Sequence, residues 1–143
     1  MTWDEKGIGL AKHIATWSKD PSTQAGAVIL DGEHRVASLG YNGFPRGVKD
    51  LPERLTNREV KYRMVVHAES NALLFARGPV RGGTIYVWPF MPCATCAAKL
   101  IQAGIARVVA PPTPPDLAER WGADLEITKQ MFHEAGVTLD ILP

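Results

Sequence analysis

The spacing of apolar residues changes twice in the first third of the chain. Between residues 3 and 19 they return roughly every three or four positions, which predicts a helix. Residues 25–30 are apolar almost without interruption and predict a short buried strand. Asp31 and Gly32 then form a turn signal, so residues 35–41 are expected to return as the second strand of a hairpin.

The middle of the chain is less regular. Residues 42–57 are polar and interrupted by glycine and proline, which predicts a long loop of the kind that often serves function. Residues 58–66 are interpreted as extended or irregular. Residues 67–77 again carry apolar side chains at helical spacing, with Gly78 as the stop signal, and predict a helix.

The second half alternates between short strands and helices. In order, we expect a strand at 84–87, a helix from Cys93 that stops at Gly104, a strand at 105–110, a stiff proline loop at 111–115, a helix at 117–135 with a break near Gly122, and a strand at 137–142. An initial hairpin followed by this alternation predicts an α/β fold with a mixed five-stranded sheet and helices on both faces.

Composition agrees with one globular domain over residues 1–143, because 45% of the residues are hydrophobic. The net charge of +1 gives no bulk field for duplex nucleic acid or an anionic membrane. We see no export signal and no apolar run of membrane-spanning length. Only two cysteines are present, which argues against a disulfide framework and favours a cytoplasmic location.

Those two cysteines and one histidine have the composition of a catalytic zinc site. Cys93 and Cys96 lie one helical turn apart, so both sulfurs can face one ion, and His67 supplies a third ligand. Three protein ligands leave the fourth position of zinc for water, whose pKa zinc lowers to about 7. Glu69, two residues beyond His67, diverges from it on a helix and is the candidate to move protons.

Two other interpretations of these residues remain open. A lone C-x-x-C pair is also a redox dithiol motif. A closed structural zinc site is the second alternative, and it needs a fourth ligand. His13, His34 and His133 are candidates for that position, although an isolated histidine is more often an ordinary surface residue.

The order His-x-Glu followed by Pro-Cys-x-x-Cys is the signature of zinc nucleobase deaminases. Residues 19–28, 40–47, 67–72 and 102–105 extend this likeness, and the chain resembles the deoxycytidylate (dCMP) deaminases of the cytidine deaminase superfamily. The resemblance implies a three-layer α/β/α fold, one zinc ion (Zn2+) per subunit, and hydrolysis of dCMP to dUMP and ammonia. Zinc hydroxide would attack C4 of cytosine while Glu69 shuttles protons.

The resemblance also implies substrate contacts. Asn42 corresponds to the residue that contacts the sugar hydroxyl, although an Asn before Gly is equally typical of a left-handed turn. The backbone amide of Ala68 is a candidate contact for the base carbonyl. Arg46 and Lys49 are the better candidates for the 5′-phosphate among several basic residues before His67. Phe44, Trp88 and Phe90 could stack on a base or belong to the core.

Two segments depart from the family pattern. Residues 88–91 are one residue longer than usual before the first cysteine, and residues 111–125 lack the expected acidic and aromatic residues. A deaminase of another nucleobase, nucleoside or pterin-like amine is therefore the alternative function. The resemblance further implies a homo-oligomer, a hexamer or a dimer, with dCTP and dTTP as effectors.

Overall fold

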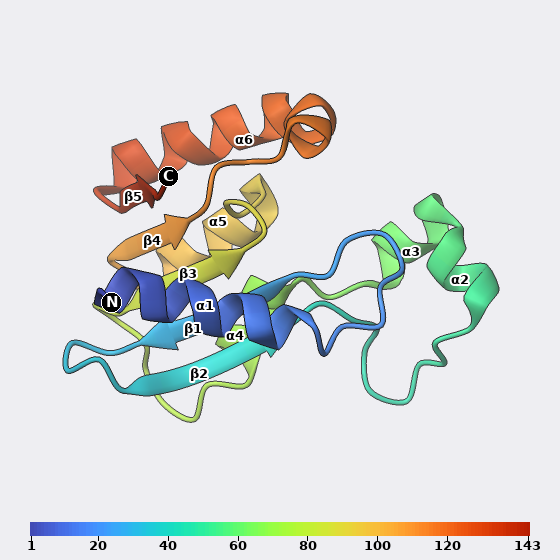
Figure 1. Cartoon of the computed structure of the whole chain (residues 1–143), viewed down its shortest axis with the longest axis horizontal. Helices are drawn as coiled ribbons and strands as arrows, with labels where there is room; N and C mark the ends of the chain where they lie inside the picture. Colours follow the sequence, from blue (N-terminus) through green and yellow to red (C-terminus); the bar gives the residue numbers. More distant parts are fainter.

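The computed structural model describes residues 1–143 and contains six helices and one sheet. Figure 1 shows α2 and α3 beyond one end of the sheet. The strands are β1 (Gly26–Leu30), β2 (Val36–Tyr41), β3 (Thr84–Trp88), β4 (Arg107–Ala110) and β5 (Thr138–Ile141). The helices are α1 (Trp3–Ala15), α2 (Pro52–Thr56), α3 (Arg58–Met64), α4 (Ala68–Leu74), α5 (Ala94–Ala103) and α6 (Pro115–Ala135).

The sheet is mixed, as the alternation of elements predicts. Its strand order is β2-β1-β3-β4-β5, with β1 antiparallel to both β2 and β3. From β3 onward the strands run parallel, each reached through a helix. The central strand β1 is buried along its whole length because it has neighbours on both sides and helices on both faces, which explains its uninterrupted apolar run.

Alternate residues of the strands build two separate cores, and three layers result. On one face, Ile14 of α1 packs with Val28 and Tyr86. On the other face, Ile29 and Val108 belong to a larger core with side chains of α4, α5 and α6. The α/β/α arrangement expected from the sequence is therefore confirmed (Figure 1).

Glycines allow two helices to lie directly against strand backbone. A Cβ atom on Gly40 of β2 would lie 2.5 Å from the Ala72 nitrogen and 2.6 Å from the Ala68 carbonyl oxygen, both in α4. A Cβ atom on Gly26 of β1 would similarly overlap the backbone of α1 at Ala11. The position of α4 is thus set by backbone contact rather than by adjustable side chains.

The segment before α4 differs from the sequence prediction. Residues 42–57 are not one loop, because α2 forms within them, and residues 58–66 are not extended, because most of them form α3. Asn57 caps α3 by accepting a hydrogen bond from the Val60 amide. Both helices are short and lack an apolar stripe: α2 buries no residue and α3 buries only Lys61, so hydrophobic spacing gave no signal.

Smaller differences concern helix ends. Helix α1 ends at Ala15 rather than near Lys19, and α4 ends at Leu74. Helix α6 runs through Gly122 without the expected break. No helix combines the length and apolar character needed to cross a lipid bilayer.

Candidate active site

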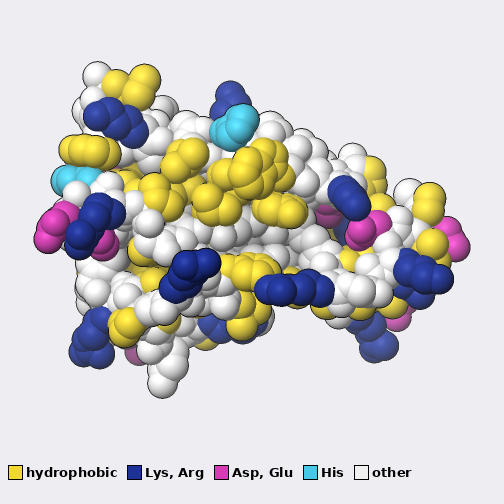
Figure 2. All heavy atoms as spheres, turned by 90° about the horizontal axis from the view of Figure 1, so that it is seen from below, with side chains coloured by type: hydrophobic (Ala, Val, Ile, Leu, Met, Phe, Trp, Pro, Cys, Tyr) yellow, Lys and Arg dark blue, Asp and Glu magenta, His cyan; other side chains and the backbone are white.

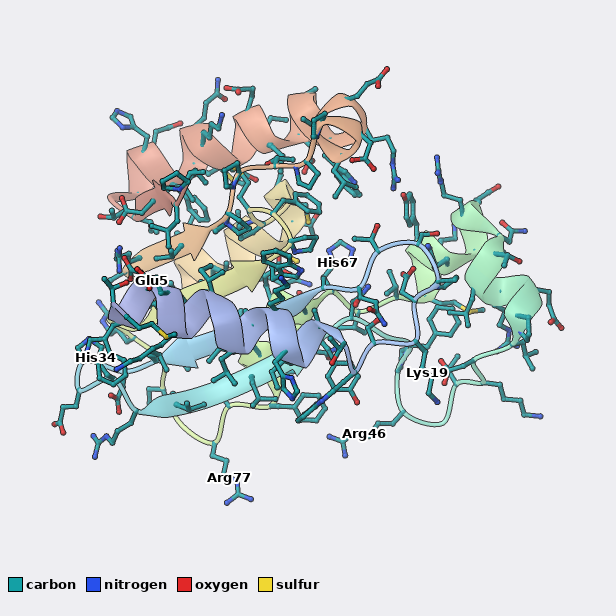
Figure 3. All side chains as sticks on the ribbon, viewed as in Figure 1. Glu5, Lys19, His34, Arg46, His67 and Arg77 are labelled. Carbon is teal, nitrogen blue, oxygen red and sulfur yellow. The ribbon has the colours of Figure 1, made fainter.

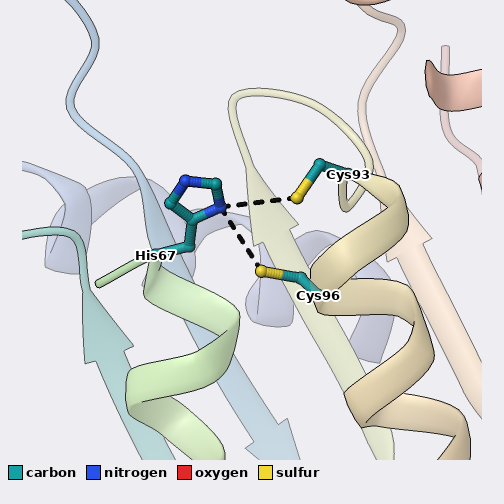
Figure 4. Close-up of side chains that lie close together, drawn as sticks. All are labelled: His67, Cys93 and Cys96. Carbon is teal, nitrogen blue, oxygen red and sulfur yellow. Dashed lines mark hydrogen bonds between the residues drawn. The ribbon is translucent and has the colours of Figure 1, made fainter. Parts of the chain in front are cut away.

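The first turns of α4 and α5 meet at the same end of the sheet, on either side of strand β3. His67 is the N-cap of α4, and Cys93 is the N-cap of α5 with Cys96 in its first turn. Figure 4 shows one ring nitrogen of His67 facing both sulfur atoms. The nitrogen and both sulfurs lie within 4.8 Å of one another, so the chain folds two soft sulfur ligands and one imidazole nitrogen into one cluster.

The distances in this cluster fit a tetrahedral zinc ion. The Nδ1 atom of His67 lies 3.4 Å from each sulfur, on Cys93 and on Cys96. Zinc–sulfur and zinc–nitrogen bonds of about 2.3 and 2.0 Å place neighbouring tetrahedral ligands about 3.5 Å apart. No other histidine, cysteine or acidic residue joins the cluster, which leaves one coordination position without a protein ligand.

The pKa values of the two thiols also indicate a site that favours binding of a cation. Hydrogen bonds from Cys96 and His67 lower the pKa of Cys93 to about 4. The hydrogen bond to Cys93 and burial raise the pKa of Cys96 well above its ordinary value. The negative charge of the Cys93 thiolate therefore disfavours ionisation of the neighbouring Cys96 thiol. A bound dication removes that conflict, because metal binding displaces the ligand protons.

Glu69 lies beside the cluster but is not part of it. It sits in the first turn of α4, is only 6% exposed and lines the adjoining cavity. Burial raises the pKa of its carboxyl group to about 7, partly opposed by the nearby charge of His67. A carboxyl group with a pKa near neutrality can both accept and donate a proton, which is the property of a general acid–base.

Four polar residues that sequence reasoning missed hold the cluster in place. Ser70 hydrogen-bonds Cys96 and accepts a hydrogen bond from Lys99. On α6, Asp124 accepts from the Ala94 amide at 2.8 Å, and the buried Thr128 hydroxyl donates to the Pro92 carbonyl at 2.9 Å. Asp124 and Thr128 are four residues apart on one helix face, the only sequence signal that could have suggested a shared role.

A cavity opens in front of the cluster. Its interior has a volume of about 90 Å³, and the cavity opens to solvent at its mouth. His67, Ala68, Glu69 and Cys93 form its inner end, and residues 87–91 form one wall. Trp88 and Phe90 therefore border the ligand space, whereas Phe44 does not line it.

Asn42 lines the same cavity, but its side chain is engaged within the protein. Its Oδ1 accepts from the Ala25 amide, and its Nδ2 donates to the Thr23 carbonyl, both at 2.9 Å. The left-handed backbone considered for Asn42 does not occur, because His34 is the only non-glycine residue with a positive φ. Asn42 thus fixes the loop before β1 while presenting an edge to the cavity.

The structure does not bring Arg46 and Lys49 to the cavity of the single chain. The Arg46 guanidinium stacks on Phe75, 4.8 Å from the ring centre, and its side chain lies away from His67 (Figure 3). Lys49 is exposed, and its carbonyl oxygen accepts a hydrogen bond from Arg54. The basic residues that do line the cavity, beyond His67, are Lys61 and Arg120, and neither was selected from the sequence.

The three remaining histidines take no part in the cluster. The His34 ring stacks on Trp3 with ring centres 4.3 Å apart, and His13 packs edge-on against Trp17. His133 lies near the far end of α6. The closed structural zinc site therefore lacks a fourth ligand from these residues.

Comparison with known proteins gives one family and several close relatives. Residues 1–111 match the family model described as "cytidine and deoxycytidylate deaminase zinc-binding region". An "uncharacterized deaminase in luxG 3'region" of Aliivibrio fischeri is 44% identical over 141 residues, covering 99% of this chain and 94% of the relative. The deoxycytidylate deaminase of Homo sapiens is 37% identical over 146 residues, covering 96% of this chain and 78% of the relative.

Among solved structures, the fold resembles that of the dCMP deaminase of cyanophage S-TIM5 in complex with dCMP and dUMP. The TM-score is 0.75 at 22% identity, and the match covers 96% of this chain and 95% of the other. This likeness confirms the fold.

Proposed function

The chain belongs to the cytidine and deoxycytidylate deaminase family, and we propose that it catalyses the zinc-dependent hydrolytic deamination of dCMP to dUMP with release of ammonia. The observation that carries the proposal is the buried Glu69 beside the His67, Cys93 and Cys96 cluster at the inner end of an open cavity. The relative from Homo sapiens, named deoxycytidylate deaminase, supports the substrate.

We assign the metal ligands to His67, Cys93 and Cys96. Their donor types and spacing fit a zinc ion with one position free for solvent. When bound, zinc makes water acidic enough to supply a nucleophile at neutral pH. The hydrogen bond between Ser70 and Cys96 and the one from the Ala94 amide to Asp124 keep α5 and its sulfurs oriented toward His67.

Glu69 is the proposed proton carrier. Its carboxylate accepts one proton from the attacking water and delivers it to N3 of cytosine. It then accepts the second proton from the hydroxyl group formed at C4 and delivers it to the leaving amino group. The reaction balances as dCMP and water giving dUMP and ammonia. The enclosed position of Glu69 limits proton exchange with bulk solvent during these transfers.

The remaining contacts orient the base and sugar. The amide of Ala68, in the first turn of α4, has no intrahelical acceptor and is assigned to the base carbonyl. Asn42 is assigned to the sugar hydroxyl because it lines the cavity at its loop side. Arg46 and Lys49 stay predictions for the phosphate, and a single chain does not place them in the cavity.

We also propose a homo-oligomer, a hexamer or a dimer, in the cytoplasm, regulated by dCTP and dTTP. Exposed apolar side chains along β2 support assembly: Val36 and Tyr41 are at least 40% exposed, and Trp17 packs edge-on against Tyr41. Figure 2 shows hydrophobic side chains gathered on one face of the molecule. The two metal-binding thiols support a reducing compartment. Light scattering with and without dCTP tests the assembly.

The first experiment measures ammonia release by zinc-loaded protein. The substrates are dCMP, CMP, deoxycytidine, cytosine, and guanine and adenine nucleosides. A strong preference for dCMP is the expected result. Turnover of an unphosphorylated base alone would keep the zinc chemistry and replace the substrate assignment, whereas no turnover of any substrate would contradict the proposal.

A further inference from the structure

The cavity contains one basic side chain whose charge is not already matched. Lys61 lies 3.3 Å from the Asp20 carboxylate, and both side chains are about 10% exposed, so this pair is internally neutral. Asp20 also accepts hydrogen bonds from the Ser22 and Thr23 amides. Arg120 lines the cavity too, yet it forms no ion pair with any carboxylate. The cavity thus offers one free positive charge, at an exposed position near its mouth.

Arg120 is held in place by a hydroxyl group rather than by an acid. Its Nη2 donates to the Tyr62 hydroxyl oxygen at 2.6 Å. Because that oxygen acts as the acceptor, the hydroxyl proton of Tyr62 remains available to a further acceptor. Two donors, one of them charged, therefore stand side by side where α3 and α6 approach the cavity. A phosphate group accepts hydrogen bonds of this kind.

A row of aromatic rings connects this pair to the wall of the cavity. The Trp121 ring centre lies 6.1 Å from that of Tyr62 and 6.4 Å from that of Phe90. All three residues line the cavity, and Phe90 belongs to the wall at residues 87–91 beside the metal cluster. The row therefore spans from the proposed base site to the Arg120 donors and joins Tyr62 of α3 to Trp121 of α6.

We propose that Arg120 and the Tyr62 hydroxyl bind the 5′-monophosphate of the substrate nucleotide, in place of Arg46 and Lys49. The inference rests on the proposed deaminase function and names the groups that distinguish a nucleotide from a nucleoside. Its physical basis is that Arg120 has no negatively charged partner within the protein, and the phosphate would supply one. The aromatic row limits the side-chain freedom of both donors before the ligand arrives.

The test compares the kinetics of Arg120→Gln with wild type on dCMP and on deoxycytidine. We expect KM for dCMP to rise about 10- to 100-fold, the effect of losing a charged hydrogen bond, while kcat and the slow turnover of deoxycytidine change less than about twofold. Tyr62→Phe should raise KM for dCMP about 3- to 10-fold. Arg120→Lys should recover part of the loss, because a point charge replaces the planar fork.

Lys129→Gln is the matched control, because it removes an exposed charge elsewhere on α6, and it should not change KM for dCMP. Arg46→Gln and Lys49→Gln test the competing assignment. If Arg120→Gln leaves KM unchanged, or weakens dCMP and deoxycytidine equally, the inference is wrong; a rise in KM for dCMP in Arg46→Gln or Lys49→Gln alone would return the phosphate to those residues. If wild type does not turn over dCMP, the proposed function fails instead. Calorimetric binding of dUMP against deoxyuridine then decides the phosphate site alone: a preference for dUMP lost in Arg120→Gln supports it, and no preference overturns it.

Discussion

The inner end and the mouth of the cavity are built in different ways. The inner end consists of His67, Glu69, Cys93 and Cys96 in first turns of helices that pack on the sheet, and Glu69 and Cys96 are nearly inaccessible. The mouth consists of Tyr62, Arg120 and Trp121 on α3 and α6, and Tyr62 is 42% exposed. Buried backbone fixes the first group, whereas the second depends on contacts between surface side chains.

The family model covers the inner end and only part of the mouth. Residues 1–111 match the family model, and this range contains the whole inner end but stops before α6. Arg120 and Trp121 therefore lie outside the matched range. From the proposed function we expect that the core carries the reaction chemistry and that the peripheral helix α6 selects the substrate. Four substitutions test that division, from the largest expected effect to the smallest.

The largest effect is expected from Cys96→Ala. Loss of one of three ligands should remove stoichiometric zinc and abolish deamination, because the nucleophile is no longer supplied. Elemental analysis measures the zinc content, and the ammonia assay measures the deamination. The structure of the mouth should be unchanged, so the affinity for dUMP should change less than about tenfold. The exposed neighbour Thr95→Ala is the control and should keep both zinc and activity. Full turnover without zinc would return the two cysteines to the redox-dithiol interpretation.

Glu69→Gln should separate proton transfer from metal binding. The isosteric amide cannot carry protons, so kcat should fall by about 10²–10⁴-fold with zinc content and KM little changed. This is the opposite of the KM effect expected for Arg120→Gln. Unchanged turnover would remove Glu69 from the mechanism and revive a structural role for the metal.

Gly40→Ala should show how strictly the inner end depends on backbone contact. The added Cβ meets backbone atoms of Ala68 and Ala72, so α4 must move and carry His67 and Glu69 with it. We expect a loss of about 1–3 kcal/mol in stability and a fall in kcat of about 10- to 100-fold. Thermal unfolding and steady-state kinetics are the measurements. Gly9→Ala, which meets no atom within 4 Å, should leave kcat unchanged.

The smallest effect is expected at a distance from both regions. Asp4 on α1 accepts hydrogen bonds from Arg107 at 2.7 and 2.8 Å and from Tyr86 at 2.9 Å. The Arg107 hydrogen bonds lower the pKa of Asp4 in the folded state. Asp4→Asn should therefore cost about 1–2 kcal/mol near neutral pH with kcat unaltered.

The pH dependence of that loss follows from the direction of the shift. A lowered folded pKa stabilises the protein above the unfolded pKa of about 3.9, and the benefit disappears as pH falls through the folded value. Denaturant titrations should thus show wild type and Asp4→Asn converging between about pH 5 and pH 2. A stability difference that stays constant over this range would contradict the proposed role of the Asp4 charge.

The sequence predicted the inner end far better than the mouth, for physical reasons. His67, Cys93 and Cys96 are the proposed metal ligands, and their types and spacing reflect that chemistry. The apolar runs of β1 and β3 reflect burial. Arg120 and Tyr62 are 58 residues apart and meet only through tertiary packing. Helix α3 gave no apolar periodicity because Lys61, its only buried residue, is charged and paired with Asp20.

The use of both cysteines in a single buried site has a practical consequence for spectroscopy. With zinc bound, neither native thiol is free to react with a labelling reagent, so the chain behaves as if it had no reactive cysteine. Glu119, exposed and adjacent to Arg120 on α6, is a suitable place to introduce one by Glu119→Cys. A fluorophore attached there would report nucleotide arrival at the mouth directly, independently of turnover.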